Sequence, residues 1–334
     1  MEFGGPALVG RPGAMRTFIT GIAGFVGQHL AAHLTAEGEE VAGLALAADR
    51  RPGAGPAGVR VHEGDVCHGE RVQALLKEVR PDRIVHLAAR SSVADSLRDP
   101  WGTFAVNAGG TVSLLEAVAA AAPAARILII GSAEAYGEVR EEELPLTEGR
   151  PLKPLTPYGI SKAAAEQVAL FYGRARGLHV VVARAFNHTG PGQEPTFVCS
   201  DFARQIARIE ASRERAVLRV GDLTARRDFS DVRDVVRAYR LLLEKGHPGE
   251  VYNVCSGEAW SIGEILEILR GQAGRPIAVE ADPARGRSED VPTLVGSFAK
   301  LEAATGWRPG IPLERTLKDL LDSWRGIVVK DRRR

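Results

Sequence analysis

The sequence predicts an α/β fold in which a doubly wound parallel sheet carries a smaller, discontinuous C-terminal domain. Three observations predict it. Short apolar runs alternate with longer amphipathic stretches through the first half of the chain, a pattern typical of buried parallel strands joined by helices. A glycine-rich turn joins the first run to the first amphipathic stretch. Past Phe186 the alternation stops at Gly190-Pro191-Gly192, and helix-like segments follow.

The apolar runs locate the strands. Six of them are expected to be buried strands: Arg16–Thr20, Val41–Ala45, Val59–His62, Arg83–Ala88, Arg126–Gly131 and Val180–Ala185. A later run, Val251–Val254, is expected to return to the same sheet. The connections between these parallel strands should be right-handed.

Amphipathic stretches lie between and after the strands. They predict helices over Phe25–Ala36, Arg71–Val79, Thr103–Ala121, Lys162–Arg176, Asp201–Ala211, Asp231–Leu243 and Ile262–Gly271. The segment Arg50–Gly58 is expected to be a surface loop. Residues 1–15 are expected to be a flexible leader, because this Gly- and Pro-rich stretch lacks the charged start and apolar run of a signal peptide.

The composition narrows the possible partners. The net charge is +1 over 334 residues, so no broad basic field is available for nucleic acid. The apolar runs are strand-length, which predicts no membrane-spanning helix. Cys67, Cys199 and Cys255 have neither metal-ligand spacing nor a disulfide framework, which favours the reducing cytoplasm and predicts no metal site.

The glycine-rich turn is Thr20-Gly21-Ile22-Ala23-Gly24-Phe25-Val26-Gly27. It follows a predicted strand and opens a predicted helix, the context that a Rossmann-type dinucleotide site requires. Gly21 permits the tight turn, Gly24 lets the backbone approach a pyrophosphate, and Gly27 lets helix and strand pack closely. The free N–H groups of the first helical turn, with Phe25 and Val26, would then face the phosphates.

The end of the second strand should contact the adenosine ribose. Asp49 in that region would suit NAD, whereas Arg50 and Arg51 would suit the 2′-phosphate of NADP. The register of the loop does not decide between them, so both cofactors remain open.

A second motif supplies acid–base chemistry. Tyr158 and Lys162 are four residues apart, so a helix places them on one face. The lysine ammonium is expected to lower the pKa of the phenol from its usual value near 10 and make Tyr158 a general acid or base. Ser132, after the fifth strand, would bond the same substrate oxygen.

Together these motifs resemble the extended short-chain dehydrogenase/reductase family. His86-Leu87-Ala88-Ala89 and Asn107-Ala108-Gly109-Gly110-Thr111 strengthen the resemblance, which runs from about residue 16 to about residue 325. It implies that Asp65 and Val66 contact the adenine and that Leu87, Ala88 and Ala89 line the cofactor. It also implies a division into a cofactor domain, 16–186 with about 230–256, and a substrate domain, 187–229 and 257–328.

The C-terminal half resembles the members of this family that act on GDP-linked hexoses. The motifs that carry this resemblance are Arg184–Gln193, Arg227-Asp228-Phe229, Val251–Gly257 and Gly306-Trp307-Arg308-Pro309. The resemblance implies that Asn187 contacts the diphosphate or sugar and that Arg227 and Arg287 clamp the diphosphate. It further implies that Asp290 contacts the nucleoside ribose and that Ser91 and Ser92 line the sugar pocket.

Three activities remain open on these residues. The first is reduction by NADPH or NADH of the C4 ketone of GDP-4-keto-6-deoxy-D-mannose, giving GDP-D-rhamnose. The second is 4,6-dehydration of GDP-mannose, with Glu134 as the base at C5. Dehydratases of the family place Asp or Ser directly before that glutamate, and Ala133 there offers no proton, which favours the reductase. The third is a non-catalytic dinucleotide sensor.

Many relatives form homodimers through a four-helix interface, and the resemblance implies one here. The candidate surfaces are the segment Leu114–Ala122 and the helix that follows Tyr158.

Overall fold

A computed structural model describes residues 13–49, 58–212, 216–282 and 291–331. Arg50, Arg51, Arg287 and Asp290 therefore lie outside the described residues, as does most of the expected leader.

A seven-stranded parallel sheet forms the centre of the molecule, in the order β10-β6-β5-β4-β1-β2-β3. Its strands are β1 Arg16–Thr20, β2 Glu40–Ala45, β3 Arg60–Glu63, β4 Arg83–His86, β5 Arg126–Ser132, β6 His179–Ala185 and β10 Val251–Val254. This confirms the predicted fold class and the return of Val251–Val254 to the sheet. The strand order reverses between β1 and β4, and ligands of such sheets bind at the carboxyl ends of the strands at this point.

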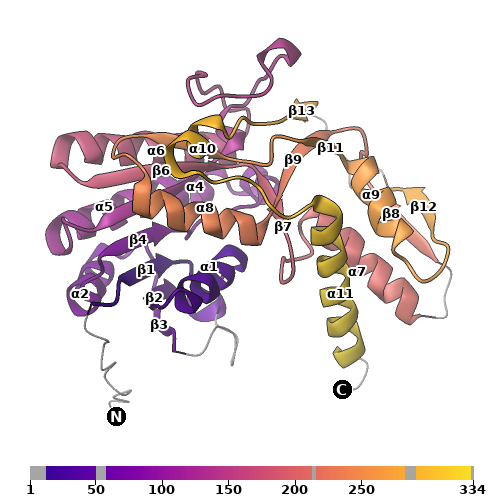
Figure 1. The fold of residues 1–334 in the computed structure, drawn as a ribbon, viewed down its shortest axis with the longest axis horizontal. Helices are drawn as coiled ribbons and strands as arrows, with labels where there is room; N and C mark the ends of the chain where they lie inside the picture. Colours follow the sequence, from indigo (N-terminus) through magenta and orange to yellow (C-terminus); the bar gives the residue numbers. More distant parts are fainter. Residues whose placement is uncertain (1–12, 50–57, 213–215, 283–290, 332–334) are drawn as a thin grey trace.

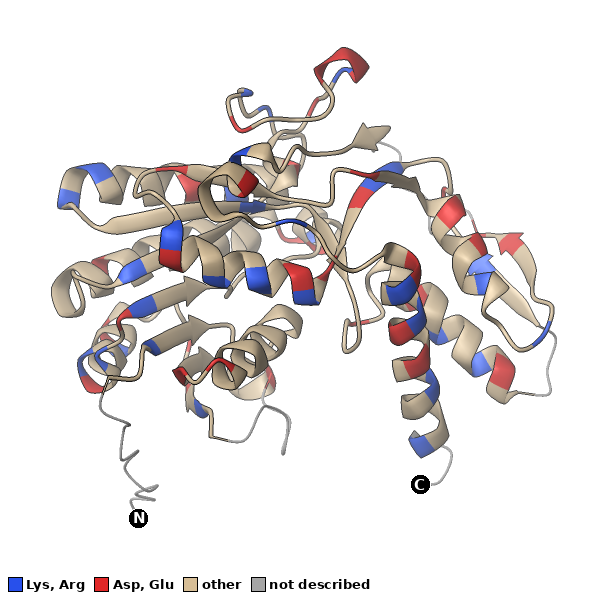
Figure 2. Cartoon of the chain, viewed as in Figure 1, with Lys and Arg blue, Asp and Glu red and all other residues tan. Residues whose placement is uncertain are grey.

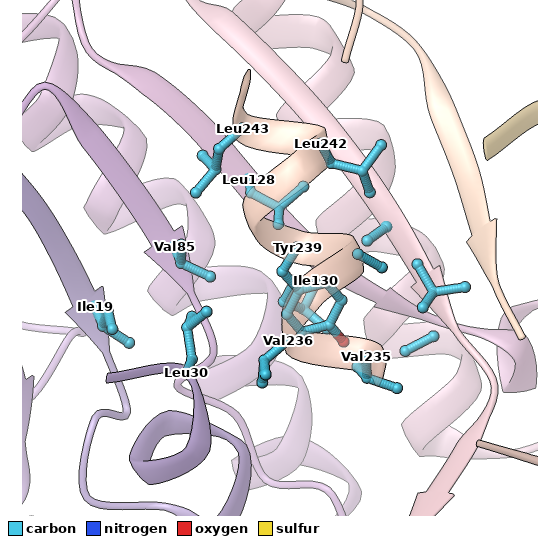
Figure 3. Close-up of a cluster of buried hydrophobic side chains, with 14 of the residues drawn as sticks. Ile19, Leu30, Val85, Leu128, Ile130, Val235, Val236, Tyr239, Leu242 and Leu243 are labelled. Carbon is cyan, nitrogen blue, oxygen red and sulfur yellow. The ribbon is translucent and has the colours of Figure 1, made fainter. Parts of the chain in front are cut away.

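Helices cover both faces of the sheet (Figure 1). On one face, α1 Phe25–Ala36 and α8 Val232–Lys245 contact each other. Figure 3 shows their side chains, among them Leu30, Tyr239 and Leu242, packed with Val85 and Leu128 of the sheet. The other face is covered by α2 Gly69–Val79, α5 Gly110–Ala121 and α6 Pro157–Arg176. Both faces are buried, which explains the nearly continuous apolar strands.

A second cluster of elements forms its own apolar core beside the central sheet, at the right in Figure 1. It contains α7 Val198–Ala211, α9 Ile262–Gly271, α11 Leu313–Asp331, and the paired strands β8 Val217–Val220 and β12 Ala278–Ala281. A small sheet made of β7 Asn187–Thr189, β9 Arg226–Asp231, β11 Ala259–Ser261 and β13 Thr293–Leu294 adjoins it. That these elements form a substrate domain stays a prediction.

The predicted helix over Thr103–Ala121 is not regular. The structure has α4 Pro100–Phe104, a π-helical turn at Ala105–Gly109, and then α5. The side chain of Asn107 in this turn bonds Arg90 and Ser161 outside the helix, and such turns often mark functional sites. By length and composition, Pro100–Ala121 is also the one helical run among the described residues that could cross a membrane, and 44% of its most apolar window is buried.

Two further helices were not predicted from the sequence, α3 Val93–Arg98 and α10 Ala299–Thr305. Both are short, and α10 ends at Gly306 in the left-handed conformation, with φ +75°. The long C-terminal helix α11 was also not predicted.

Candidate active site

The catalytic helix begins where the sequence motifs place it. Thr156 caps α6, its Oγ1 accepting the backbone N–H of Gly159 at 3.0 Å, and Pro157 occupies the first turn. A Cβ at Gly159 would lie 2.6 Å from the carbonyl oxygen of Glu134, so glycine allows the helix to approach the segment after β5 closely. This approach brings Tyr158 to Ser132.

The Tyr158 hydroxyl lies beside the Ser132 side chain and interacts with it. Burial raises the pKa of Tyr158 to about 12; the interaction with Ser132 opposes this change and the charge of Glu134 adds to it. The expected lowering of this pKa by Lys162 is therefore wrong for the protein without cofactor. The physical reason is burial, which outweighs every other influence on the phenol.

Lys162 is buried and donates from Nζ to the carbonyl oxygen of Ile130 in β5. Burial lowers the pKa of Lys162 to about 8. The pKa values of the two groups are thus changed in opposite directions. The phenol stays protonated, and the lysine gives up its proton more easily than usual.

Glu134 lies in the short helical turn η3, Ala133–Ala135, that follows Ser132. Its backbone N–H donates to Ser132 Oγ at 3.2 Å, and its carboxylate is only partly buried. Ala133, by contrast, is 2% exposed and packs with Tyr136 and Phe186 in an apolar cluster. The position before the glutamate therefore has apolar surroundings and no acid.

The glycine turn has the geometry predicted for it. Gly21 has φ +72°, and a Cβ there would lie 2.8 Å from the backbone nitrogen of Ala88. At Gly27 a Cβ would lie 2.7 Å from Ile22 Cα, so helix and turn meet closely. Gly24 caps α1 with no side chain to accept the first-turn N–H groups, including those of Phe25 and Val26. These features fit a dinucleotide pyrophosphate at the end of α1.

A chain of buried hydrogen bonds extends from this turn to the catalytic helix. His86 Nδ1 contacts Thr20 Oγ1 at 2.7 Å, and His86 Nε2 contacts Thr111 Oγ1 at 3.1 Å. Thr111 Oγ1 donates to the carbonyl oxygen of Asn107 at 2.6 Å, and Asn107 Nδ2 donates to Ser161 Oγ at 2.9 Å. Because Thr111 uses its proton on Asn107, His86 must donate from Nε2.

Burial lowers the pKa of His86 to about 3, with Lys162 adding to the effect, so the ring is neutral at physiological pH. Sequence reasoning quoted His86 and Asn107 only as parts of motifs. Both are polar residues that follow buried apolar runs. Because a buried polar side chain without a hydrogen-bond partner is costly, this position could have indicated their roles.

The remaining cofactor candidates lie along the carboxyl ends of β2, β3 and β4. Asp49 is exposed, four residues beyond the end of β2. Asp65 accepts the backbone N–H of Cys67 at 2.9 Å, and Val66 is buried in the apolar cluster between the central sheet and the helices α2, α5 and α6. Leu87, Ala88 and Ala89 follow β4 and are partly buried. Their contacts with a cofactor stay predictions.

The substrate candidates are spread over several elements. Ser91 is exposed and Ser92 caps α3, its Oγ accepting the N–H of Asp95 at 3.1 Å. Asn187 is partly buried in β7. Arg227 is 7% exposed, and its guanidinium donates to the carbonyl oxygens of Arg226 and Val291. A role of Arg227 at a diphosphate stays a prediction.

Within the described ranges, no group of three or more His, Cys, Asp or Glu side chains could hold a metal ion. The three cysteines are free; Cys67 is exposed and the other two are buried.

Comparisons with known proteins find relatives along nearly the whole chain. A family model described as GDP-mannose 4,6 dehydratase matches residues 18–320. The GDP-6-deoxy-D-mannose reductase of Pseudomonas aeruginosa is 39% identical over 94% of this chain and 98% of its own length.

Two solved structures have the same fold. RMD from Pseudomonas aeruginosa complexed with NADPH has a TM-score of 0.82 at 37% identity, covering 94% of this chain and all of the other. The UDP-glucose 4-epimerase of Thermus thermophilus in complex with NAD has a TM-score of 0.84 at 34% identity, covering 93% and 99%.

Proposed function

Because the chain belongs to the GDP-mannose 4,6-dehydratase family of extended short-chain dehydrogenases, we propose that it reduces a GDP-linked 4-keto sugar. The substrate is GDP-4-keto-6-deoxy-D-mannose and the product is GDP-D-rhamnose. The enzyme is an oxidoreductase that uses a nicotinamide dinucleotide, NADPH or NADH.

One observation carries the proposal: a phenol kept protonated by burial, Tyr158, lies beside Ser132 at a site whose adjoining position, Ala133, is apolar. Ketone reduction needs one proton donor, and dehydration needs an additional group to help the C6 hydroxyl leave. Absence of a positioned acid typically costs a factor on the order of 10²–10⁴ in rate, which favours reduction. The identity to a GDP-6-deoxy-D-mannose reductase points the same way.

The residues divide the chemistry between them. The bound cofactor supplies the hydride to C4. Tyr158 donates its proton to the carbonyl oxygen, and its raised pKa keeps that proton in place until the oxygen becomes basic. Ser132 orients the same oxygen, and Lys162 would hold the nicotinamide ribose. One ketone, one hydride and one proton give one alcohol.

The substrate's anionic end requires local cations in a nearly neutral protein. Arg227 and Arg287 would bind the diphosphate, Asn187 the diphosphate or sugar, and Asp290 the ribose. Ser91 and Ser92 would line the sugar pocket. Asp65 and Val66 would hold the adenine of the cofactor.

A dehydratase remains the second candidate, because Glu134 is close enough to Tyr158 to raise its pKa. A carboxylate beside the reactive face of the sugar could remove the C5 proton. The sensor interpretation has less support, since Tyr158 and Lys162 are both present at the carboxyl edge of the sheet.

Paired assays separate these activities. The protein is supplied with GDP-4-keto-6-deoxymannose and NADPH or NADH, and absorbance near 340 nm is followed with product identification by NMR. In parallel it is supplied with GDP-mannose and the oxidised cofactor. We expect turnover in the first assay only; a keto product in the second assay alone refutes the reductase.

We further propose a cytoplasmic homodimer. Support for the dimer comes from five exposed apolar side chains on packed helices, named here the α4–α6 patch: Leu97, Trp101 and Phe104 from α3 and α4, and Ile160 and Phe171 from α6. The expected contribution of Leu114–Ala122 stays a prediction: Leu114, Leu115 and Val118 are buried inside the subunit, whereas Glu116 and Ala120 on the same helix are exposed. The three free cysteines suit a reducing compartment.

A further inference from the structure

Arg184 and Asn253 belong to two motifs that the sequence associates with the sugar substrate, yet both side chains are buried behind the catalytic helix. Arg184 in β6 is 5% exposed and Asn253 in β10 is fully buried. Their hydrogen bonds run to the protein interior and join four segments of chain.

The first link is to the catalytic helix. Glu166 lies on α6 at a spacing of four from Lys162 and of eight from Tyr158, so the three residues share one face. Arg184 donates a hydrogen bond to each carboxylate oxygen of Glu166, from Nε to Oε2 at 2.8 Å and from Nη2 to Oε1 at 2.6 Å. A bidentate pair of this kind fixes orientation as well as distance.

The second link is to the segment that carries Ser132 and Glu134. The third nitrogen of Arg184, Nη1, donates to Tyr136 Oη at 3.0 Å, and to the carbonyl oxygen of Glu148 at 3.1 Å. Tyr136 is fully buried and follows Glu134 by two residues. Its hydroxyl donates to Asn253 Oδ1 at 2.7 Å, and Asn253 Nδ2 donates to the carbonyl oxygen of Leu146 at 3.0 Å.

The geometry points to Arg184 and Tyr136 as positioning residues that set the separation between the catalytic helix and the Ser132–Glu134 segment. The inference rests on the proposed function only for its kinetic test. Arg184 can contact the helix and the segment at once because its guanidinium is a rigid fork, which a lysine ammonium cannot replace. Apolar packing could bury the same volume, but it would not fix how the Tyr158 and Ser132 side chains face each other.

Two variants test this with little change in packing. Tyr136→Phe keeps the ring and removes the bonds of the hydroxyl to Arg184, to Asn253 and to the carbonyl oxygen of Thr147. Arg184→Lys keeps the charge opposite Glu166 and removes the fork. Tyr172→Phe is the matched control, since Tyr172 lies on the same helix and its hydroxyl bonds Glu116 away from the site.

We expect kcat to fall about tenfold or more in both test variants, because small misplacements of reacting groups are costly. The KM for the sugar and the Kd for NADPH should stay within about twofold. The solvent deuterium isotope effect on kcat should rise, because proton donation from a misplaced Tyr158 becomes slower. A variant that only lost folded protein would keep the isotope effect unchanged, and that result, like a kcat equal to that of Tyr172→Phe, overturns the inference.

A measurement without substrate separates this inference from the proposed function. The titration of Lys162 is followed by NMR of ¹³Cε-labelled lysine, where the wild type should have a midpoint near pH 8. The neighbouring titratable groups, His86 and Tyr158, have pKa values of about 3 and about 12 and do not titrate in this range. Loosened contact with β5 admits water, so the midpoint should move upward in Tyr136→Phe and Arg184→Lys and stay in Tyr172→Phe. Unchanged midpoints refute the inference, whereas an inactive wild type refutes the proposed function alone.

Discussion

Tyr158 and Lys162 are prepared for reduction by their surroundings more than by each other. Burial keeps the phenol protonated and destabilises the ammonium, since a charged group loses hydration in the interior. A proton donor for a ketone must hold its proton until the oxygen gains charge, so a raised pKa suits the reductive direction. The protonation states of Tyr158 and Lys162 should therefore depend on whether cofactor and substrate are bound beside them.

Replacement of Tyr158 by phenylalanine tests the proton donor. The change removes one hydroxyl and keeps the ring, so the glycine turn and the cofactor contacts are untouched. We expect kcat to fall by a factor on the order of 10²–10⁴. NADPH binding, measured by its fluorescence, should stay within about twofold of the wild type. Near-normal turnover would show that another group supplies the proton.

Burial of the charged Lys162 side chain should lower the free energy of unfolding of the protein. Its pKa falls from the usual 10.5 to about 8, so the folded chain binds fewer protons than the unfolded chain between these values. Stability therefore rises with pH across this window, and the full penalty of the buried charge is present below pH 8.

Lys162→Met should remove that penalty. After allowance for the lost bond to Ile130, we expect the free energy of unfolding at pH 7 to rise by about 2 kcal/mol. The gain should shrink as the pH approaches 10.5. Urea unfolding of both proteins without cofactor, at pH 7 and at high pH, measures it; a less stable variant at pH 7 contradicts the argument.

At the scale of elements, the turn between β1 and α1 separates a packing role from a binding role. A Cβ at Gly27 meets backbone atoms of Gly21 and Ile22, which cannot move without opening the turn. A Cβ at Gly24 meets only the carbonyl oxygen of Gly21, at 3.2 Å. The two glycines should therefore respond differently to the same added methyl group.

We expect Gly27→Ala to destabilise the fold by about 1–3 kcal/mol, as overpacking typically does. Gly24→Ala should unfold within about 1 kcal/mol of the wild type and yet bind NADPH at least tenfold more weakly, because the methyl group occupies the approach to the pyrophosphate. Urea midpoints and NADPH titrations report the two effects. Equal loss of stability in both variants would contradict the division of roles.

The sequence predicted the central sheet well for a physical reason: strands buried on both faces are continuous apolar runs, and β1 and α1 were placed to the residue. The short strands β7, β8 and β12 carry no such run, since each is partly exposed and mixed in character. Helix α11 was not predicted, although its sequence indicates a helix: four buried leucines recur at helical spacing, Leu313, Leu317, Leu320 and Leu321.

The candidate site shows the same limit. Tyr158, Lys162 and Ser132 follow from local spacing and chain order. The roles of Arg184 and Asn253 depend on β6 lying between β5 and β10, which is a property of strand order and not of any local pattern. The raised pKa of Tyr158 depends on burial, which spacing alone does not determine.

On the scale of the whole molecule, residues of both charges are interspersed along the helices and loops (Figure 2). A substrate diphosphate must therefore be recognised by a few local groups. Asp228 helps to assemble the region where they meet: it accepts the N–H groups of Ser256, Gly257 and Gly296, and so joins the carboxyl end of β10 to the small sheet. Burial raises the pKa of Asp228 to about 6, although these hydrogen bonds act to lower it.

The α4–α6 patch carries the last prediction. Trp101 is 76% exposed and Phe171 is 56% exposed, on helices that contact each other. Ile160 and Phe171 are eleven residues apart on α6, about three turns, so they lie on the same side of the helix. Exposed apolar side chains gathered on neighbouring helices typically mark a subunit interface.

Light scattering of the wild type at micromolar concentration should give twice the chain mass of 35.7 kDa. The double variant Trp101→Glu, Phe171→Glu places charges in the interface and should give the single mass with the same far-ultraviolet circular dichroism. Exposed Leu46 and Val329 lie on other elements, so Leu46→Glu with Val329→Glu is the matched control and should remain a dimer. A wild-type monomer at this concentration, or a dimer that survives both charges in the patch, would remove the interface. Loss of the dimer would uncover Ile160, which lies two residues from Tyr158. A single variant such as Phe171→Ala should weaken the dimer without abolishing it. A fall in kcat in this variant that reverses at high protein concentration would connect dimer formation to the proton donor.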